Sequence, residues 1–261
     1  MSETGKPISR IDGRLKVTGK ATYSAEFNQP NMAYAFPVRA TIAKGQIASI
    51  DDAAAKKEPG VISVISYKNA PKLKPLDIQA QMKAGAAFLG ESLPPLQDNK
   101  VHYRGQFIAV VVAETYEQAR TAAYKLKVRY TVEKAATDLK SELPNSTKPK
   151  MLMGEDAQVN EGKAAAPLAA SAHRVDHSYS TPAEHHHPME PHATVAVWDG
   201  TEKLTLYDAT QGVGITSAIA AYFLGLQPEN VLVIAPFVGG GFVELGANGF
   251  AVSPQVSYAV F

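Results

Sequence analysis

The chain has no cysteine and almost no imbalance of charge. Without a thiol among its 261 residues it cannot form a disulfide, a thiolate zinc site, a cysteine nucleophile or a cysteine-ligated iron–sulfur cluster. Its 26 Lys and Arg residues nearly match its 25 Asp and Glu residues, for a net charge of +1. This balance argues against a general nucleic-acid binder or a polybasic membrane binder.

Long apolar runs are missing as well. No run approaches about 18 apolar residues, so no membrane-spanning helix is expected. Residues 1–16 lack the apolar core of a secretory signal, and we expect a cytoplasmic location. What the chain does have is 45% hydrophobic and 20% charged residues, the profile of a globular protein with one large domain or two modest ones.

Basic residues stop at Lys203. The 58 residues after it carry only Asp208, Glu229 and Glu244 as charged side chains. A stretch this apolar, interrupted by glycine and proline, is typical of the inner layer of a larger structure.

Residues 33–132 are predicted to form a compact α+β unit. Thr115 and Gln118 form a capping box that predicts the start of a helix, because a hydroxyl and an amide three residues apart can satisfy each other's backbone N–H groups. Asp51 and Asp52 are placed to begin a shorter helix that runs to Lys57. β-branched or alternating runs predict strands at 46–50, 61–65, 107–113 and 128–132.

The remainder divides into a linker and a second unit. Residues 133–170 are rich in Lys, Pro and Ala and are predicted to link two domains. A hairpin is expected around Asp199-Gly200. A helix is expected from about Thr216 to Leu224, ending before Gly225, where a positive φ costs glycine little. Strands are predicted at 175–180, 192–198, 204–209 and 231–238. The last of them has the composition of a strand buried on both faces, but we expect it to lack its cover in this chain.

Three consecutive glycines, Gly239, Gly240 and Gly241, follow the last of these strands. Such a run lets the backbone approach a ligand closely and expose its amides, although a simple tight turn is an alternative. The run matches neither the G-x-G-x-x-G dinucleotide pattern nor the G-x-x-x-x-G-K-[ST] phosphate loop, so both of those interpretations fail.

Residues 185–192 hold four histidines and a glutamate in the run His-His-His-Pro-Met-Glu-Pro-His. Imidazole and carboxylate groups can bind zinc, but neighbouring histidines on a strand point to opposite faces. The alternative is a turn shaped by Pro188 and Pro191. Glu190 and Asp208 are also candidates for acid–base chemistry, with nothing in the sequence to show that they are paired or buried.

An ordered set of motifs resembles a known family. Residues 10–13 (Arg-Ile-Asp-Gly) and 16–23 (Lys-Val-Thr-Gly-Lys-Ala-Thr-Tyr) resemble the entry motif of the molybdenum-binding large subunit of the xanthine dehydrogenase/aldehyde oxidase family. The motifs at 189–192 (Met-Glu-Pro-His), 210–211 (Thr-Gln) and 238–242 (Val-Gly-Gly-Gly-Phe) recur there in the same order. The resemblance covers residues 8–242.

The resemblance implies an α+β fold in which an α/β hammerhead domain is followed by the start of a molybdopterin-binding domain. Its implied boundaries are an N-terminal extension at 1–18, the hammerhead domain at 19–132, the linker at 133–170 and the molybdopterin-binding part at 171–261. The family hydroxylates aldehydes or N-heterocycles with oxygen from water. Electrons leave through iron–sulfur and FAD subunits or domains, and some complexes reach the periplasm through a partner's export signal.

The resemblance also assigns site residues. Gln211 matches the glutamine that donates a hydrogen bond to an oxo ligand of molybdenum. Gly240, Gly241 and Phe242 match the loop that packs on the cofactor. No catalytic residue and no protein ligand of a metal is implied within this chain, because the family's general-base glutamate lies near the end of a much longer subunit.

After Phe242 the chain departs from the family, which continues with Gly-x-Lys or a close variant where this chain has Val-Glu-Leu-Gly. We therefore expect an incomplete subunit that is inactive alone. Two other hypotheses remain: a non-catalytic assembly module that binds partner subunits, and a metal-binding protein that uses residues 185–192.

Overall fold

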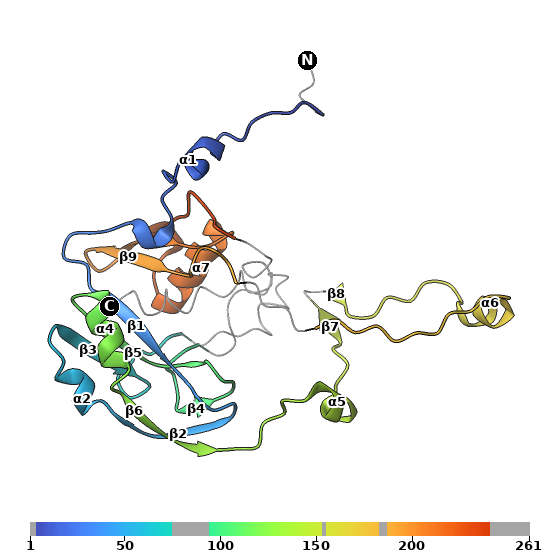
Figure 1. Ribbon diagram of the computed structural model, residues 1–261, viewed down its shortest axis with the longest axis horizontal. Coiled ribbons are helices and arrows are strands. Elements are labelled where there is room, and N and C mark those ends of the chain that lie inside the picture. Colours follow the sequence, from blue (N-terminus) through green and yellow to red (C-terminus); the bar gives the residue numbers. More distant parts are fainter. Residues whose placement is uncertain (1–3, 75–93, 153–154, 183–186, 241–261) are drawn as a thin grey trace. The chain divides into compact units, whose positions relative to one another are not determined.

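The computed structural model describes residues 4–74, 94–152, 155–182 and 187–240 (Figure 1). The chain divides into two compact units. The first comprises Met1–Leu76, Leu89–Ala135 and Pro188–Phe261, and the second comprises Asp77–Phe88 and Ala136–His187. Within the described residues, no helix is both long enough and apolar enough to cross a membrane.

One antiparallel sheet of the first unit is built around a hydrophobic central strand. β5 (Phe107–Ala113) pairs with β1 (Tyr34–Arg39) on one side and β3 (Val61–Ser66) on the other. Pro37 is tolerated in β1 because an edge strand does not need every backbone N–H group for pairing. The short helix α2 (Ala53–Lys56) and helix α4 (Tyr116–Ala123) pack on this sheet through small buried alanines.

A second antiparallel sheet has β2 (Gly45–Asp51) at its centre, between β4 (Lys100–Val101) and β6 (Lys127–Val132). Ile47 of β2 and Val101 of β4 share a core with Ile108 of β5, so the two sheets are held together by apolar side chains. The four strands and the strand–helix–strand order expected over 33–132 are confirmed.

The capping box is present as predicted. The Gln118 backbone N–H donates to Thr115 Oγ1 at 3.2 Å, and the Thr115 backbone N–H donates to Gln118 Oε1 at 3.0 Å. At α2 the roles of the two aspartates differ from the expectation. Asp52 occupies the cap position without a side-chain hydrogen bond, and Asp51 Oδ1 instead accepts from the Ala53 N–H.

The later part of the first unit forms a sheet in the order β11–β10–β9, covered by helix α7 (Val213–Leu224). β9 (Thr194–Asp199) and β10 (Lys203–Asp208) form the predicted antiparallel hairpin. β11 (Val231–Ile234) follows the short helix η3 (Pro228–Asn230) and runs parallel to β10, and α7 supplies the crossover that a parallel pair requires.

Two expectations for this region need correction. α7 begins at Val213 rather than at 216, although it ends as predicted before Gly225, whose φ is +71°. β11 ends at Ile234 rather than at residue 238, and Leu232 is 56% exposed. The strand is apolar, but Leu232 has no covering layer within the described residues.

The N-terminal segment returns to the β9–β10 hairpin. It contains α1 (Gly13–Val17) and the single turn η1 (Ser24–Glu26), which contacts both β9 and β10. The Phe27 ring stacks on Tyr207 with centroids 4.3 Å apart. A segment at the start of the chain is therefore part of the packing around a sheet that forms near its end.

The second unit has short elements and exposed side chains. Its described elements are α5 (Leu139–Glu142), η2 (Leu143–Asn145), β7 (Met151–Leu152), β8 (Glu155–Asp156) and α6 (Ala165–Ala170). The strand expected at 175–180 is absent from the described structure. Val175 is 78% exposed and Tyr179 is 87% exposed, so this run has the composition of a strand without a partner on which to form one.

Candidate functional site

Three loops meet at one edge of the β11–β10–β9 sheet. β10 and β11 are parallel, with Leu204 opposite Val231, so both strands end at the same edge. β9 is antiparallel and begins there, with Thr194 opposite Asp208. Ligands of sheets with parallel strands bind characteristically beyond the carboxyl ends of those strands. Residues 190–194, 208–212 and 235–240 therefore form the candidate functional site.

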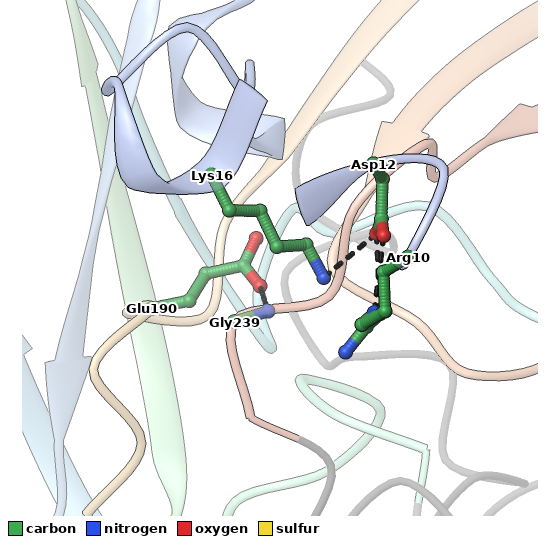
Figure 2. A network of polar contacts seen from close by, with 5 residues as sticks. All are labelled: Arg10, Asp12, Lys16, Glu190 and Gly239. Carbon is green, nitrogen blue, oxygen red and sulfur yellow. Dashed lines mark hydrogen bonds and ion pairs between the residues drawn. The ribbon is translucent and has the colours of Figure 1, made fainter. Parts of the chain in front are cut away.

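Glu190 connects two of these loops. Its Oε2 accepts the backbone N–H of Gly239 at 2.6 Å, which Figure 2 shows as a dashed line. Its Oε1 accepts the hydroxyl of Ser24 at 3.3 Å, and Ser24 is only 4% exposed. The carboxylate thus joins the glycine run to both the 190–194 loop and the N-terminal segment.

Gly239 is required here for space. A Cβ atom on this residue would lie 2.3 Å from Glu190 Cβ and 3.3 Å from Glu190 Cα. A contact of 2.3 Å does not occur between real carbon atoms, so the two backbones approach each other only because residue 239 has no side chain.

Asp208, the last residue of β10, is a buried carboxyl at the same edge. It is 2% exposed and accepts a hydrogen bond from the Thr194 hydroxyl across the hairpin. Burial raises the pKa of Asp208 from 3.8 to about 6, against the lowering effects of Thr194 and His192, and the negative charge of Glu190 raises it further.

The loop that carries Gln211 is fixed by its neighbour. Thr210 is buried, its hydroxyl lies 2.9 Å from that of Thr216 on α7, and its Oγ1 accepts the Gly212 N–H at 3.1 Å. Gln211 itself is exposed. The backbone on both sides of Gln211 is thus held to the start of α7, while the residue itself stays accessible to solvent.

The N-terminal segment lies against the approach to the glycine run. The ring centroids of Tyr23 and Phe237 are 6.0 Å apart, and Lys16 Nζ lies 5.8 Å from the centroid of Phe237. Lys16 also pairs with Asp12 at 3.0 Å (Figure 2). The hydrogen bond from Lys16, with further help from Arg10, holds the pKa of the Asp12 carboxyl below its usual range.

The structure describes two of the four site residues predicted from the sequence. Gln211 and Gly240 both lie in loops at the candidate edge, and Gly240 is partly exposed. Gly241 and Phe242 lie outside the described residues. The roles of Ser24, Thr194 and Thr210 were missed by the sequence analysis, since an isolated hydroxyl carries no pattern that reveals a distant partner.

The histidine-rich run does not gather ligands in the part of it that the structure describes. His185 and His186 lie outside the described residues. Among the residues that are described, no group of three His, Asp or Glu side chains is arranged to hold a metal ion.

Two family profiles match the chain. The profile "Aldehyde oxidase and xanthine dehydrogenase, a/b hammerhead domain" matches residues 18–134, and "Molybdopterin cofactor-binding domain" matches residues 145–253. In these two matches the chain is similar to the N-terminal part of the molybdenum-binding subunits of the aldehyde oxidase and xanthine dehydrogenase family, as its motifs predicted.

Characterised relatives agree with this assignment. PaoC, the aldehyde oxidoreductase molybdenum-binding subunit of Escherichia coli K12, is 41% identical over 241 residues, which are 91% of this chain and 31% of PaoC. The large molybdopterin subunit of nicotinate dehydrogenase from Eubacterium barkeri is 28% identical over 245 residues, which are 91% of this chain and 54% of that subunit. The chain thus spans about a third of the length of PaoC.

Solved structures show the same fold. Quinoline 2-oxidoreductase from Pseudomonas putida 86 superposes with a TM-score of 0.72 at 24% identity, over 91% of this chain and 31% of that one. Aldehyde oxidoreductase from Desulfovibrio gigas gives a TM-score of 0.70 at 23% identity, over 96% of this chain and 29% of that one. The predicted fold class is confirmed.

Proposed function

We propose that this chain supplies one wall of the molybdenum-cofactor site in a molybdenum hydroxylase that oxidises an aldehyde or an N-heterocycle. The observation that carries the proposal is the convergence of the Gln211 loop and the glycine run at one sheet edge, where β10 and β11 both end. Both are donor groups of the kind that an anionic cofactor needs: a carboxamide with two N–H groups and backbone amides without side chains.

Each residue has a stated role. Gln211 would donate a hydrogen bond to the molybdenum centre of the bound cofactor, and Thr210 orients it by holding the backbone on either side. Gly240, followed by Gly241 and Phe242, would pack against the cofactor and present backbone groups to it. When bound, the cofactor supplies the two-electron oxidation of the substrate with oxygen derived from water.

We assign no catalytic acid or base to the described residues. Glu190 and Asp208 were candidates, but the structure engages them with other groups of the chain. Glu190 holds Gly239 and Ser24, and Asp208 is buried against Thr194. The general base of the reaction is therefore proposed to lie outside this chain's described part.

The relatives are named as subunits, which implies partner chains. We propose iron–sulfur and FAD-binding subunits as these partners, because the electrons taken from the substrate need acceptors. We also propose the domain boundaries 1–18, 19–132, 133–170 and 171–261. Location in the cytoplasm, or in the periplasm through a partner's signal, stays a prediction that cell fractionation tests.

A chimera tests the function. The matching segment of the E. coli PaoC subunit is replaced by residues 8–240 of this chain, and the complex is purified with its partner subunits. We expect stoichiometric molybdenum and aldehyde oxidation. Gln211→Ala should lower kcat by on the order of 10²-fold at unchanged molybdenum content, since it removes one donor to the reacting centre. Gln227→Ala, at another exposed glutamine, is the matched control.

The outcomes separate the hypotheses. A fully active Gln211→Ala chimera contradicts the role of that residue. A chimera that copurifies with its partners but contains no molybdenum supports the non-catalytic assembly module instead. The 261-residue chain alone should hold no stoichiometric molybdenum and show no hydroxylase activity, because its described residues supply one side of the cofactor site.

A further inference from the structure

We propose that Glu190 is the positioning residue that fixes the glycine run at Gly239, and that Ser24 of the N-terminal segment holds the Glu190 carboxylate in place. This inference rests on the proposed function only in identifying the glycine run as part of the cofactor site. The bridge itself is a property of this chain (Figure 2).

The hydrogen bond to Gly239 is of a strong type. A carboxylate that accepts a backbone N–H forms a charge-assisted bond, which is shorter and stronger than a bond between neutral groups, and the 2.6 Å distance agrees with this. Glu190 is partly buried and Gly239 is exposed, so solvent reaches the Gly239 amide whenever this bond opens. The bond sets the direction of the Gly239 amide, one residue before Gly240.

Ser24 completes the bridge from the other side. Its hydroxyl is buried, and a buried donor without an acceptor costs free energy. Donation to Glu190 Oε1 satisfies that hydroxyl and leaves the second carboxylate oxygen for Gly239. Both oxygens of one side chain are thus committed to two segments that lie far from it in the sequence.

The backbone around Glu190 is stiff. Pro188 and Pro191 have a restricted φ, and the residue that precedes a proline is driven to an extended conformation. Glu190 occupies that preceding position. Its side chain therefore starts from a fixed backbone, which lowers the entropy that the bridge must overcome.

The glycine run is shaped to receive this side chain. A Cβ on residue 239 would collide with Glu190 Cβ. The hydrogen bond to Glu190 therefore requires glycine at this position. On the preceding side, Phe237 is packed by Tyr23 and Lys16 of the N-terminal segment. The loop is consequently held at Phe237 and at Gly239, immediately before Gly240.

The direct test is amide hydrogen exchange of the full chain, followed by NMR. Glu190→Ala should speed exchange of the Gly239 amide at least tenfold, and Ser24→Ala should speed it less. Glu190→Gln, which keeps an acceptor but loses the charge, should fall between wild type and Glu190→Ala. Glu202→Ala, at an exposed glutamate in the β9–β10 turn, should leave it unchanged.

Amides of β5 serve as the internal reference, because a general loss of structure would speed their exchange as well. The inference is overturned if the Gly239 amide exchanges equally fast in wild type and Glu190→Ala. It is also overturned if Glu190→Ala speeds the exchange of the β5 amides as much as that of Gly239. If Glu190→Ala does not fold, Glu190→Gln and Ser24→Ala still decide the matter by the same measurement.

A second measurement separates this inference from the proposed function. In the PaoC chimera, Glu190→Gln should lower molybdenum content severalfold, whereas Gln211→Ala should lower kcat alone. If the chimera binds no molybdenum, the proposed function fails, but the exchange of Gly239 still decides whether Glu190 positions the loop. Whether or not the chimera binds molybdenum, slower exchange of the Gly239 amide in Glu190→Gln than in Glu190→Ala supports the bridge.

Discussion

Replacement of Asp208 by Asn should change how stability depends on pH. Because burial raises the pKa of Asp208 to about 6, the folded protein binds this proton more tightly than the unfolded chain, where the pKa is near 3.8. The stability that the carboxyl contributes is therefore fully present below about pH 4 and is lost as the pH rises through about 6.

The magnitude follows from that difference in pKa. Each pH unit between the two values corresponds to about 1.4 kcal/mol, so ionisation of Asp208 in the folded protein costs roughly 3 kcal/mol. Asparagine keeps an oxygen that can accept the Thr194 hydroxyl and carries no charge. The stability of Asp208→Asn relative to wild type should therefore rise by roughly 2–2.5 kcal/mol between pH 4 and pH 7, whatever constant offset its amide adds.

The assay is urea unfolding of both proteins, followed by circular dichroism at several pH values. A stability difference that does not vary with pH would refute the argument, because it would mean that Asp208 titrates alike in the folded and unfolded states. Thr194→Val provides a second check. It removes the donor that stabilises the charged carboxylate, so it should cost about 1–3 kcal/mol at pH 7 and less in the Asp208→Asn background.

Three further predictions concern the scaffold. Thr115→Ala should destabilise the protein by about 1 kcal/mol in urea unfolding, and unchanged stability would contradict the importance of the capping box. Gly225→Ala should cost about 1–2 kcal/mol in the same assay, because the residue keeps a left-handed conformation that a Cβ disfavours; a neutral result would mean that α7 ends differently in solution. In the described sheet β11 pairs only with β10, so its apolar edge should promote self-association. Leu232→Lys should shift light scattering toward the monomer, and equal scattering would assign the association to another surface.

Local patterns were sufficient to predict much of the fold. The capping box at Thr115, the hairpin around Asp199-Gly200 and the end of α7 before Gly225 each depend on residues a few positions apart, and all three are confirmed. The strand expected at 175–180 failed for the converse reason. A run of suitable residues becomes a strand only when another strand is available to pair with it.

The candidate site was predictable only in its parts. The glycine run and Gln211 stand out in the sequence. The parallel pairing of β10 and β11, which brings their loops to one edge, cannot be recognised there. The contacts of Glu190 with Gly239 and Ser24 join residues 49 and 166 positions apart, and no local pattern encodes such distances. Burial of Asp208 likewise depends on what covers the end of β10 rather than on its neighbours in the chain.

The carboxylate bridge also has a consequence for the order of folding. The β9–β10 hairpin and the β10–α7–β11 crossover form from neighbouring stretches of chain, whereas the entropic cost of closing a loop grows with the number of residues enclosed. Contacts between distant residues therefore tend to form late. During synthesis the segment with Ser24 emerges first and Gly239 emerges long afterwards. The glycine run should thus be among the last parts of this unit to reach its final conformation, so a cofactor that needs it would meet a unit whose sheet and helix have already formed.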